Sequence, residues 1–134
     1  MPFFYKLIKQ ISDEMQKNAN NALRSQNMTV TQMETLIELE SISEKQCTLK
    51  ELEHRLHVAQ STAAGIITRL EQKGFVEGFG DPADRRIKVV RITSAGIQCV
   101  LDARQNMLEA EAQLLSGLTE TERGIFFALL KKGS

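Results

Sequence analysis

A short basic segment followed at once by an apolar strand pattern is the feature that most restricts the fold of this chain. Residues 84–93, DRRIKVVRIT, place Arg85 and Arg86 at a turn, after which apolar and polar residues alternate as in a half-buried strand. Just upstream, residues 61–70 carry small polar side chains first and apolar ones afterwards, which indicates a helix. A helix that leads into a basic β-hairpin predicts a winged helix-turn-helix, a DNA-binding arrangement.

Helical periodicity continues on both sides of this segment. Apolar residues at three- and four-residue steps predict an amphipathic helix over about 1–24, and a second helix runs to about Ser41 before a polar connector at 43–46. Three threonines stand three positions before a glutamate, the spacing of a capping box that opens a helix. These pairs are Thr31 with Glu34, Thr48 with Glu51, and Thr119 with Glu122.

The middle of the chain has helix-turn-helix spacing. A three-residue turn at 57–59 precedes a helix over about 60–73, which ends at Gly74 because glycine commonly occupies the left-handed position after a helix. Strands at 75–79 and 88–92 follow, joined by a Gly-Asp-Pro-Ala-Asp turn. Thr93 then caps another long helix. The predicted fold is mainly α-helical with a small β-hairpin wing.

A single domain over residues 1–134 is expected, because a chain of this length suits one hydrophobic core. A winged helix-turn-helix needs only about 31–93, the DNA-reading lobe. The terminal helices, at about 2–24 and 95–132, carry apolar stripes longer than a small core covers, so we expect a second subunit to cover them in a homodimer. The stripes include Phe3, Phe4, Leu7, Ile11, Leu114, Leu115, Phe126 and Leu129.

Composition limits the remaining possibilities. No apolar run approaches the roughly 20 residues that span a bilayer, and the first 15 residues do not resemble a signal peptide, so we expect a cytoplasmic protein without a membrane partner. The 17 basic and 17 acidic residues of the chain cancel. Residues 55–91 nevertheless hold seven basic and four acidic residues, an excess of +3 (7 − 4) where the DNA-reading lobe is expected.

Four segments carry a family resemblance: QST at 60–62, LEQKGFVE at 70–77, DPADRR at 81–86 and ITSAG at 92–96. Their order and spacing resemble the MarR family of bacterial and archaeal transcription regulators, and the similarity extends over nearly the whole chain. The resemblance implies an obligate dimer that binds a pseudo-palindromic DNA operator, most often as a repressor. It also implies release by a small anionic or phenolic ligand or by an oxidant, with a pocket between the dimerisation helices and the DNA-reading lobe.

Three positions depart from the family pattern. Glu53 stands where the family usually has Ala, Ala59 replaces the usual capping Ser or Asp, and Gly78 replaces a frequent Arg at the start of the wing. The last two changes remove a helix cap typically worth about 1 kcal/mol and one phosphate contact.

Base contacts are expected from the start of the helix at 60–73, where short polar side chains reach base edges in the major groove. Gln60, Ser61 and Thr62 occupy these positions, and Gln60 has the groups to pair bidentately with adenine. Arg69, a little over two turns later, is expected to reach a phosphate. The alternative is that these residues form only a solvated helix face.

The wing supplies the second set of expected contacts. Arg86 resembles the family arginine that enters the minor groove of DNA. The negative potential of this groove attracts the arginine. Asp84 is expected to orient this guanidinium through a hydrogen-bonded ion pair, and Arg85 and Lys88 are expected to contact phosphates. The alternative is an exposed hairpin with a surface ion pair worth roughly 0 to 1 kcal/mol.

Other reactive residues point to no further chemistry. Cys47, near Lys45, is either an oxidant-sensing thiol or an inert one; we favour the inert thiol, because redox-sensing members of the family carry their cysteine in the first helix. Cys99 is expected to be a small core residue. His54 and His57 have half-site spacing without a third ligand, so we expect no metal and no cofactor. The chain lacks GxSxG, P-loop and HExxH motifs and is not expected to be an enzyme.

Two hypotheses for the function result. The first is a sequence-specific, dimeric DNA-binding transcription regulator that acts as a ligand-responsive repressor. The second is a winged-helix protein-interaction module without DNA binding, motivated by the zero net charge and by Gly78. The segment 84–86 favours the first hypothesis, because an interaction module has no need of two arginines beside an intact reading helix.

Overall fold

The computed structural model describes residues 3–134, so residue 2, the first of the expected N-terminal dimerisation segment, lies outside the described part of the chain. The order of elements is α1 (Phe4–Ser25), α2 (Val30–Ser41), β1 (Gln46–Thr48), α3 (Leu49–Leu56), α4 (Gln60–Gln72), β2 (Val76–Gly80), β3 (Lys88–Ile92), α5 (Ser94–Leu114) and α6 (Glu120–Gly133). The predicted mainly helical architecture with a β-hairpin wing is confirmed. No helix among these residues is long and apolar enough to cross a membrane.

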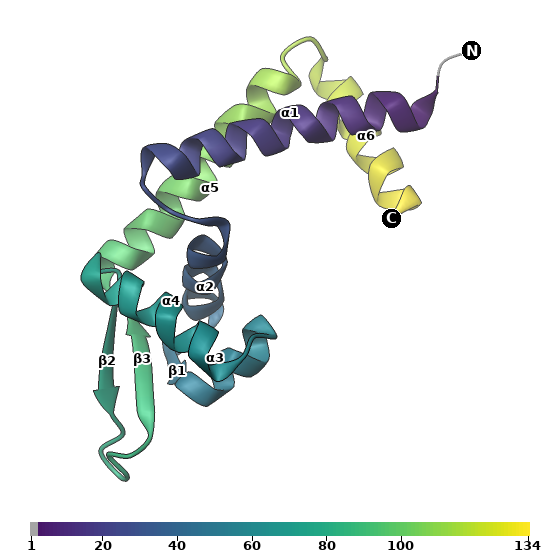
Figure 1. Ribbon diagram of the computed structural model, residues 1–134. Coiled ribbons are helices and arrows are strands. Elements are labelled where there is room, and N and C mark those ends of the chain that lie inside the picture. Colours follow the sequence, from purple (N-terminus) through teal and green to yellow (C-terminus); the bar gives the residue numbers. More distant parts are fainter. Residues whose placement is uncertain (1–2) are drawn as a thin grey trace.

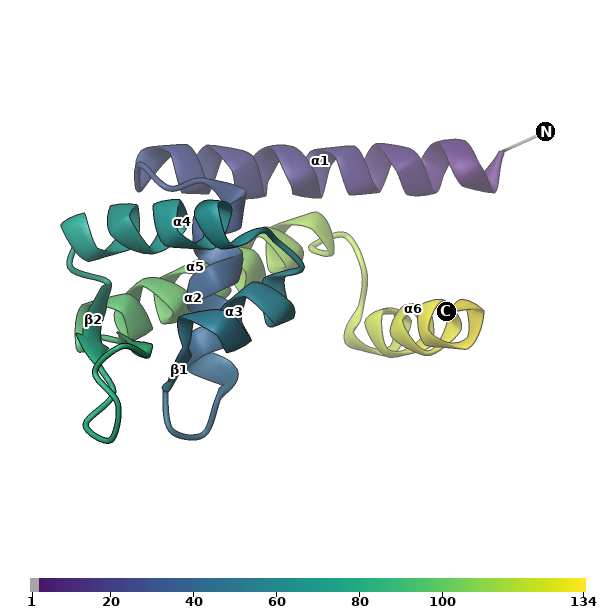
Figure 2. The same cartoon turned by 60° about the horizontal axis from the view of Figure 1, so that its bottom comes forward.

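The elements divide the molecule into two ends (Figure 1). Helices α2, α3 and α4 pack with the small sheet into one lobe, from which the turn between β2 and β3 projects as the wing. Helices α1 and α5 lie side by side at the other end, and α5 also packs on α2. Helix α6 lies beyond the far end of α5, away from the lobe (Figure 2). Helix α5 connects the two ends, because Cys99 and Val100 near its start belong to the core of the lobe.

A three-stranded antiparallel sheet with the order β1-β3-β2 supports the wing. Lys88 pairs with Gly80 at the turn end of the hairpin, and Val90 pairs with Cys47 on the other side of β3. Strand β1 was not predicted: its first residue, Gln46, was assigned to a polar connector, and its last, Thr48, was predicted as a helix cap. Three residues are too few to show an alternating pattern, so this strand is defined by its pairing with β3 and not by its own sequence.

The predicted helix starts are mostly confirmed. The hydroxyls of Thr48, Thr93 and Thr119 each accept a backbone N–H in the first turn of α3, α5 and α6, and Thr119 and Glu122 form a full capping box. Each such cap typically contributes about 1 kcal/mol.

The capping box predicted at Thr31 is wrong. Helix α2 begins two residues earlier, where Gln32 N donates to Thr29 Oγ1 (3.1 Å) and Thr29 N donates to Gln32 Oε1 (3.2 Å). Glutamine serves as well as glutamate in this motif. Met28 and Met33, the two positions of a hydrophobic staple around this cap, are both buried, and their burial favours the earlier start.

The core of the lobe fixes the orientation of α4. Ala63, Ile67 and Leu70 are fully buried on one face of α4, so the opposite face is directed to solvent. At the start of α5, a Cβ on Gly96 would stand 2.2 Å from the Phe75 carbonyl oxygen, so only glycine allows this helix to pass so close to the chain before β2.

Candidate nucleic-acid interface

The expected base-contacting residues lie on the exposed face of α4. Gln60, Ser61 and Thr62 form its first turn and are all exposed, as is Arg69 near its end. No side chain caps this helix at Ala59, so the departure seen in the sequence does remove the cap. The first N–H groups of the helix therefore remain available to an acceptor such as a phosphate.

The turn of the helix-turn-helix depends on an unusual backbone conformation at His57. This residue ends α3 with φ of 55° in the left-handed region, and its N–H donates to the His54 carbonyl. Histidine is among the residues that tolerate this conformation better than most. His57 thus has a structural role.

No cluster of three His, Cys, Asp or Glu side chains suited to a metal ion occurs in residues 3–134.

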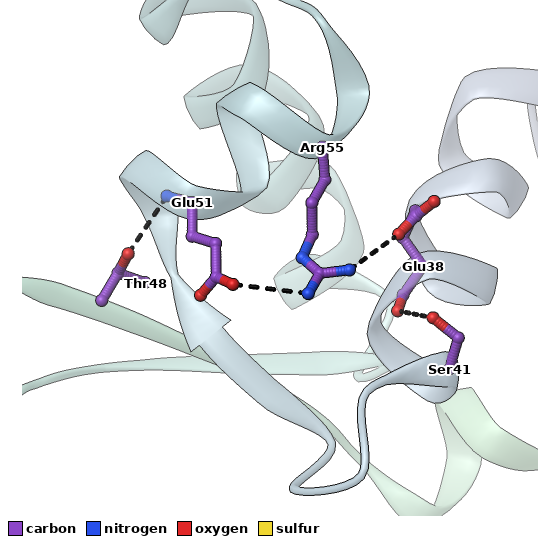
Figure 3. A network of polar contacts seen from close by, with 5 residues as sticks. All are labelled: Glu38, Ser41, Thr48, Glu51 and Arg55. Atoms are coloured by element: carbon purple, nitrogen blue, oxygen red, sulfur yellow. Dashed lines mark hydrogen bonds and ion pairs between the residues drawn. The ribbon is translucent and has the colours of Figure 1, made fainter.

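Ion pairs around Arg55 connect α3 to α2 (Figure 3). The Arg55 guanidinium lies 3.4 Å from Glu51 Oε1, one turn earlier on α3, and 3.4 Å from Glu38 Oε2 on α2. Thr48 caps the same helix through the N–H of Glu51, and the Ser41 hydroxyl donates to the Glu38 carbonyl. Arg55 belongs to the positive excess noted in the sequence, but two carboxylates neutralise it.

At the tip of the wing, Arg86 and Asp84 form the expected ion pair. Arg86 Nε donates to Asp84 Oδ1 at 3.0 Å, Arg86 Nη2 donates to Oδ2 at 3.1 Å, and the Arg86 backbone N–H also donates to Oδ1. These hydrogen bonds from Arg86 lower the pKa of the Asp84 carboxyl, and Asp84 raises the pKa of the guanidinium. The Arg86 side chain is 91% exposed. A cation of fixed orientation is therefore presented to solvent.

The other cations of the wing differ in their surroundings. Arg85 is exposed and has no ion-pair partner among residues 3–134. Lys88 Nζ lies 3.1 Å from Glu71 Oε1 on α4. Arg91 donates to Glu77 and Gln46. These pairs were not predicted from the sequence, because their members are 14 to 45 positions apart and meet only in the folded chain.

Both thiols are buried, and burial disfavours their reactive thiolate form. Burial raises the pKa of Cys47 to about 11 and also raises the pKa of Cys99. At neutral pH the reactive thiolate is scarce, which supports the inert interpretation of Cys47.

A largely apolar cavity of about 300 Å³ lies between α1, α2 and α5. Met15 and Ala22 of α1, Met33 of α2 and Met107 of α5 line it. Arg104 also borders the cavity, and its guanidinium binds both Glu40 oxygens, at 2.8 and 3.3 Å. This ion pair lowers the pKa of Glu40. The cavity has the position that the family resemblance predicted for a pocket, although its lining residues were not predicted.

The arrangement of α3, α4 and the hairpin defines a winged helix-turn-helix protein with long terminal helices. Residues 28–88 match the model of the MarR family, and the resemblance of the chain to this family is confirmed.

Comparison with individual proteins gives the extent of the similarity. The chain is 33% identical over 75 residues to the HTH-type transcriptional regulator YwaE of Bacillus subtilis, a match that covers 56% of this chain and 44% of YwaE. It is 27% identical to the regulator YxaD of the same organism, over 90% of this chain and 78% of YxaD. The chain therefore spans less than half of the length of YwaE. These relatives are named as transcription regulators and not as enzymes.

Solved structures match over almost the full chain. The MepR–DNA complex of S. aureus superposes with a TM-score of 0.83 and 28% identity, covering 96% of each chain. Wild-type MarR of E. coli superposes with a TM-score of 0.74 and 25% identity, covering 98% of this chain and 96% of MarR. The similarity thus includes the terminal helices as well as the DNA-reading lobe.

Proposed function

We propose that this chain is a sequence-specific DNA-binding transcription regulator. The observation that carries the proposal is the exposure of two separate polar surfaces on one lobe: the first turn of α4 and the oriented Arg86 at the wing tip. Gln60, Ser61 and Thr62 would read base edges in the major groove while Arg86 enters the minor groove. The likeness to a MepR structure bound to DNA supports this assignment.

Phosphate contacts complete the proposed interface. Arg69, near the end of α4, and Arg85, in the wing turn, are exposed cations and would bind the backbone of the duplex. Lys88 already has a carboxylate partner on α4 and is not counted among these free cations.

The regulator would act as a homodimer on a pseudo-palindromic operator, because two copies of the lobe related by a two-fold axis meet two half-sites. Large apolar side chains exposed on α1 and α6, among them Phe4 (78%) and Phe127 (67%), support a dimer built through the terminal helices. A cytoplasmic location is part of the same proposal, because a DNA-binding regulator works where the chromosome is.

The cavity between α1, α2 and α5 would hold the effector that makes a repressor ligand-responsive. It lies between the proposed dimerisation helices and the DNA-reading lobe, so a ligand there would touch both. Its three methionines favour a small apolar or aromatic molecule.

A specific observation keeps a protein-interaction module as the second candidate. Three of the lobe's cations, Arg55, Lys88 and Arg91, already bind carboxylates, which lowers the free positive charge for DNA. Selection of bound fragments from random duplex DNA at low salt separates the candidates. The regulator enriches a two-fold symmetric sequence, whereas the absence of enrichment favours the interaction module.

A further inference from the structure

One ion pair links the wing to α4. Lys88 is the first residue of β3, directly after the wing turn, and its Nζ lies 3.1 Å from Oε1 of Glu71 in the last turn of α4. Both side chains are partly shielded from water, with 42% and 35% of their surfaces exposed. Among the ion pairs of residues 3–134, this is the one that joins the hairpin to α4.

The neighbouring strand provides the space for this ion pair. A Cβ at Gly78 would stand 2.7 Å from Cε of Lys88, 3.3 Å from its Nζ and 3.4 Å from Glu71 Oε1. Gly78 is not among the residues with positive φ, so its backbone does not require glycine. The missing side chain instead leaves a path over β2, along which Lys88 reaches the helix.

The Lys88–Glu71 ion pair affects the distance between the two proposed DNA-reading surfaces, the wing tip and the first turn of α4. The wing tip with Arg86 is connected to the lobe through the ends of β2 and β3, and Arg91 binds partners on β1 and β2 only. A link from the start of β3 to α4 therefore restricts how far the tip moves relative to the recognition helix. A wing that is already placed loses less conformational freedom when it binds.

We infer that Lys88 and Glu71 form a strut that sets the position of the wing relative to α4, so that Lys88 is a positioning residue and not a phosphate contact. This inference rests on the proposed DNA binding for its functional consequence. The strut itself is a property of the free protein and can be tested without DNA.

The DNA experiment compares affinity for the selected operator, over a range of salt concentrations, in the parent and in Glu71→Gln, Lys88→Met and the double variant. We expect each single variant to weaken binding by about three- to fivefold, the upper part of the range for an exposed ion pair. The double variant should bind no more weakly than either single one, because both changes remove the same interaction. Glu53→Gln is the matched control, since it removes a carboxylate of the same lobe that has no ion-pair partner within residues 3–134.

A phosphate contact by Lys88 gives the opposite pattern. Glu71→Gln would then tighten binding, because it frees the lysine and removes a negative charge near the DNA. Lys88→Met alone would weaken binding and flatten the slope of log K against log salt by about 0.9. That result overturns the strut.

Amide hydrogen exchange in the free protein is the second measurement. Exchange at residues 81–87 should accelerate in both single variants, to the same extent in the double variant, and not in Glu53→Gln. If the parent selects no DNA, the proposed function fails, but this measurement still decides on the strut. Unchanged exchange in both single variants overturns it, whatever the DNA result.

Discussion

At the scale of single residues, the wing presents a preorganised cation. The two hydrogen bonds from the Arg86 guanidinium to Asp84 fix the plane of the group, and the backbone N–H of Arg86 fixes the carboxylate in turn. A bidentate pair of this kind is stronger and more directional than a single contact between the same charges. Because Arg86 is almost fully exposed, the pair has little effect on the core and its effect is expected on binding.

Replacing Arg86 should therefore affect DNA binding and leave folding intact. We expect Arg86→Ala to weaken operator affinity by well over tenfold and to flatten the salt dependence by about 0.9 for each phosphate charge no longer neutralised. Asp84→Ala should give a milder defect, because the arginine remains but is no longer oriented. Salt titrations of operator affinity measure the binding defect of both variants, and thermal melts show whether each is still folded. Unchanged affinity in Arg86→Ala would exclude the wing as a DNA contact and favour the interaction module.

Cys47 should be unreactive in the folded protein. Its pKa of about 11 and its burial predict that a thiol reagent at pH 8 modifies Cys47 far more slowly in the native chain than in the unfolded one. The raised pKa also favours the folded state below the ordinary value of 9.0, and this contribution is lost as the pH rises toward about 11. Cys99→Ser isolates the signal of Cys47. Rapid modification of native Cys99→Ser, with loss of DNA affinity, would instead indicate an oxidant sensor.

At the scale of elements, the features that could be predicted are those determined by residues close together in the sequence. The helix-turn-helix, the hairpin and the caps at Thr48, Thr93 and Thr119 each depend on a few consecutive side chains, and all are present. The Asp84–Arg86 pair was also predictable, because its members are two positions apart.

Most of the features that were missed depend on contacts between distant segments. Strand β1 exists through its pairing with β3, and Lys88 meets Glu71 only once the hairpin has folded over α4. The start of α2 at Thr29 was missed for a local reason, since glutamine takes the position of glutamate in its capping box. The lining of the cavity needed the packing of three helices.

The position of α4 gives a prediction that separates specificity from affinity. Gln60→Ala should change the sequence preference, because a bidentate base contact is worth about 1 to 3 kcal/mol of discrimination. Arg69→Ala should weaken binding to all sequences alike, as expected for a phosphate contact. Affinities for the operator and for its single-base variants test both. If every relative affinity survived in Gln60→Ala, the proposed placement of this helix in the major groove would be wrong.

At the scale of the whole molecule, the terminal helices leave a large apolar surface without a partner in the single chain. Nothing in α1 or α6 is fully buried, although both carry several large apolar residues. Of the predicted stripes, Phe3, Phe4, Leu7, Ile11, Leu114 and Leu129 are exposed, and Leu115 and Phe126 are half-buried. The core of the lobe is by contrast well buried, and the first turns of α5 contribute Cys99 and Val100 to it. An exposed apolar surface of this kind is typical of an oligomer interface.

The dimer is the prediction that belongs to this scale. Light scattering at micromolar concentration should give about twice the chain mass of 15.1 kDa. Replacing both Phe127 and Leu129 by Asp should shift the protein toward monomer, because burying one such side chain contributes roughly 1.5 to 3 kcal/mol and a buried charge costs more. Circular dichroism should show that the lobe remains folded, since neither residue belongs to its core.

An exposed apolar residue outside the terminal helices serves as the control for this double variant. Ile87, in the wing turn, is 42% exposed, and Ile87→Asp should leave the mass at twice that of the chain. The double variant should also lose its preference for symmetric DNA, because a single lobe meets only one half-site. A parent protein that is folded by circular dichroism and a clean monomer at micromolar concentration would remove the physical basis for palindromic recognition. The exposed stripes would then need another partner.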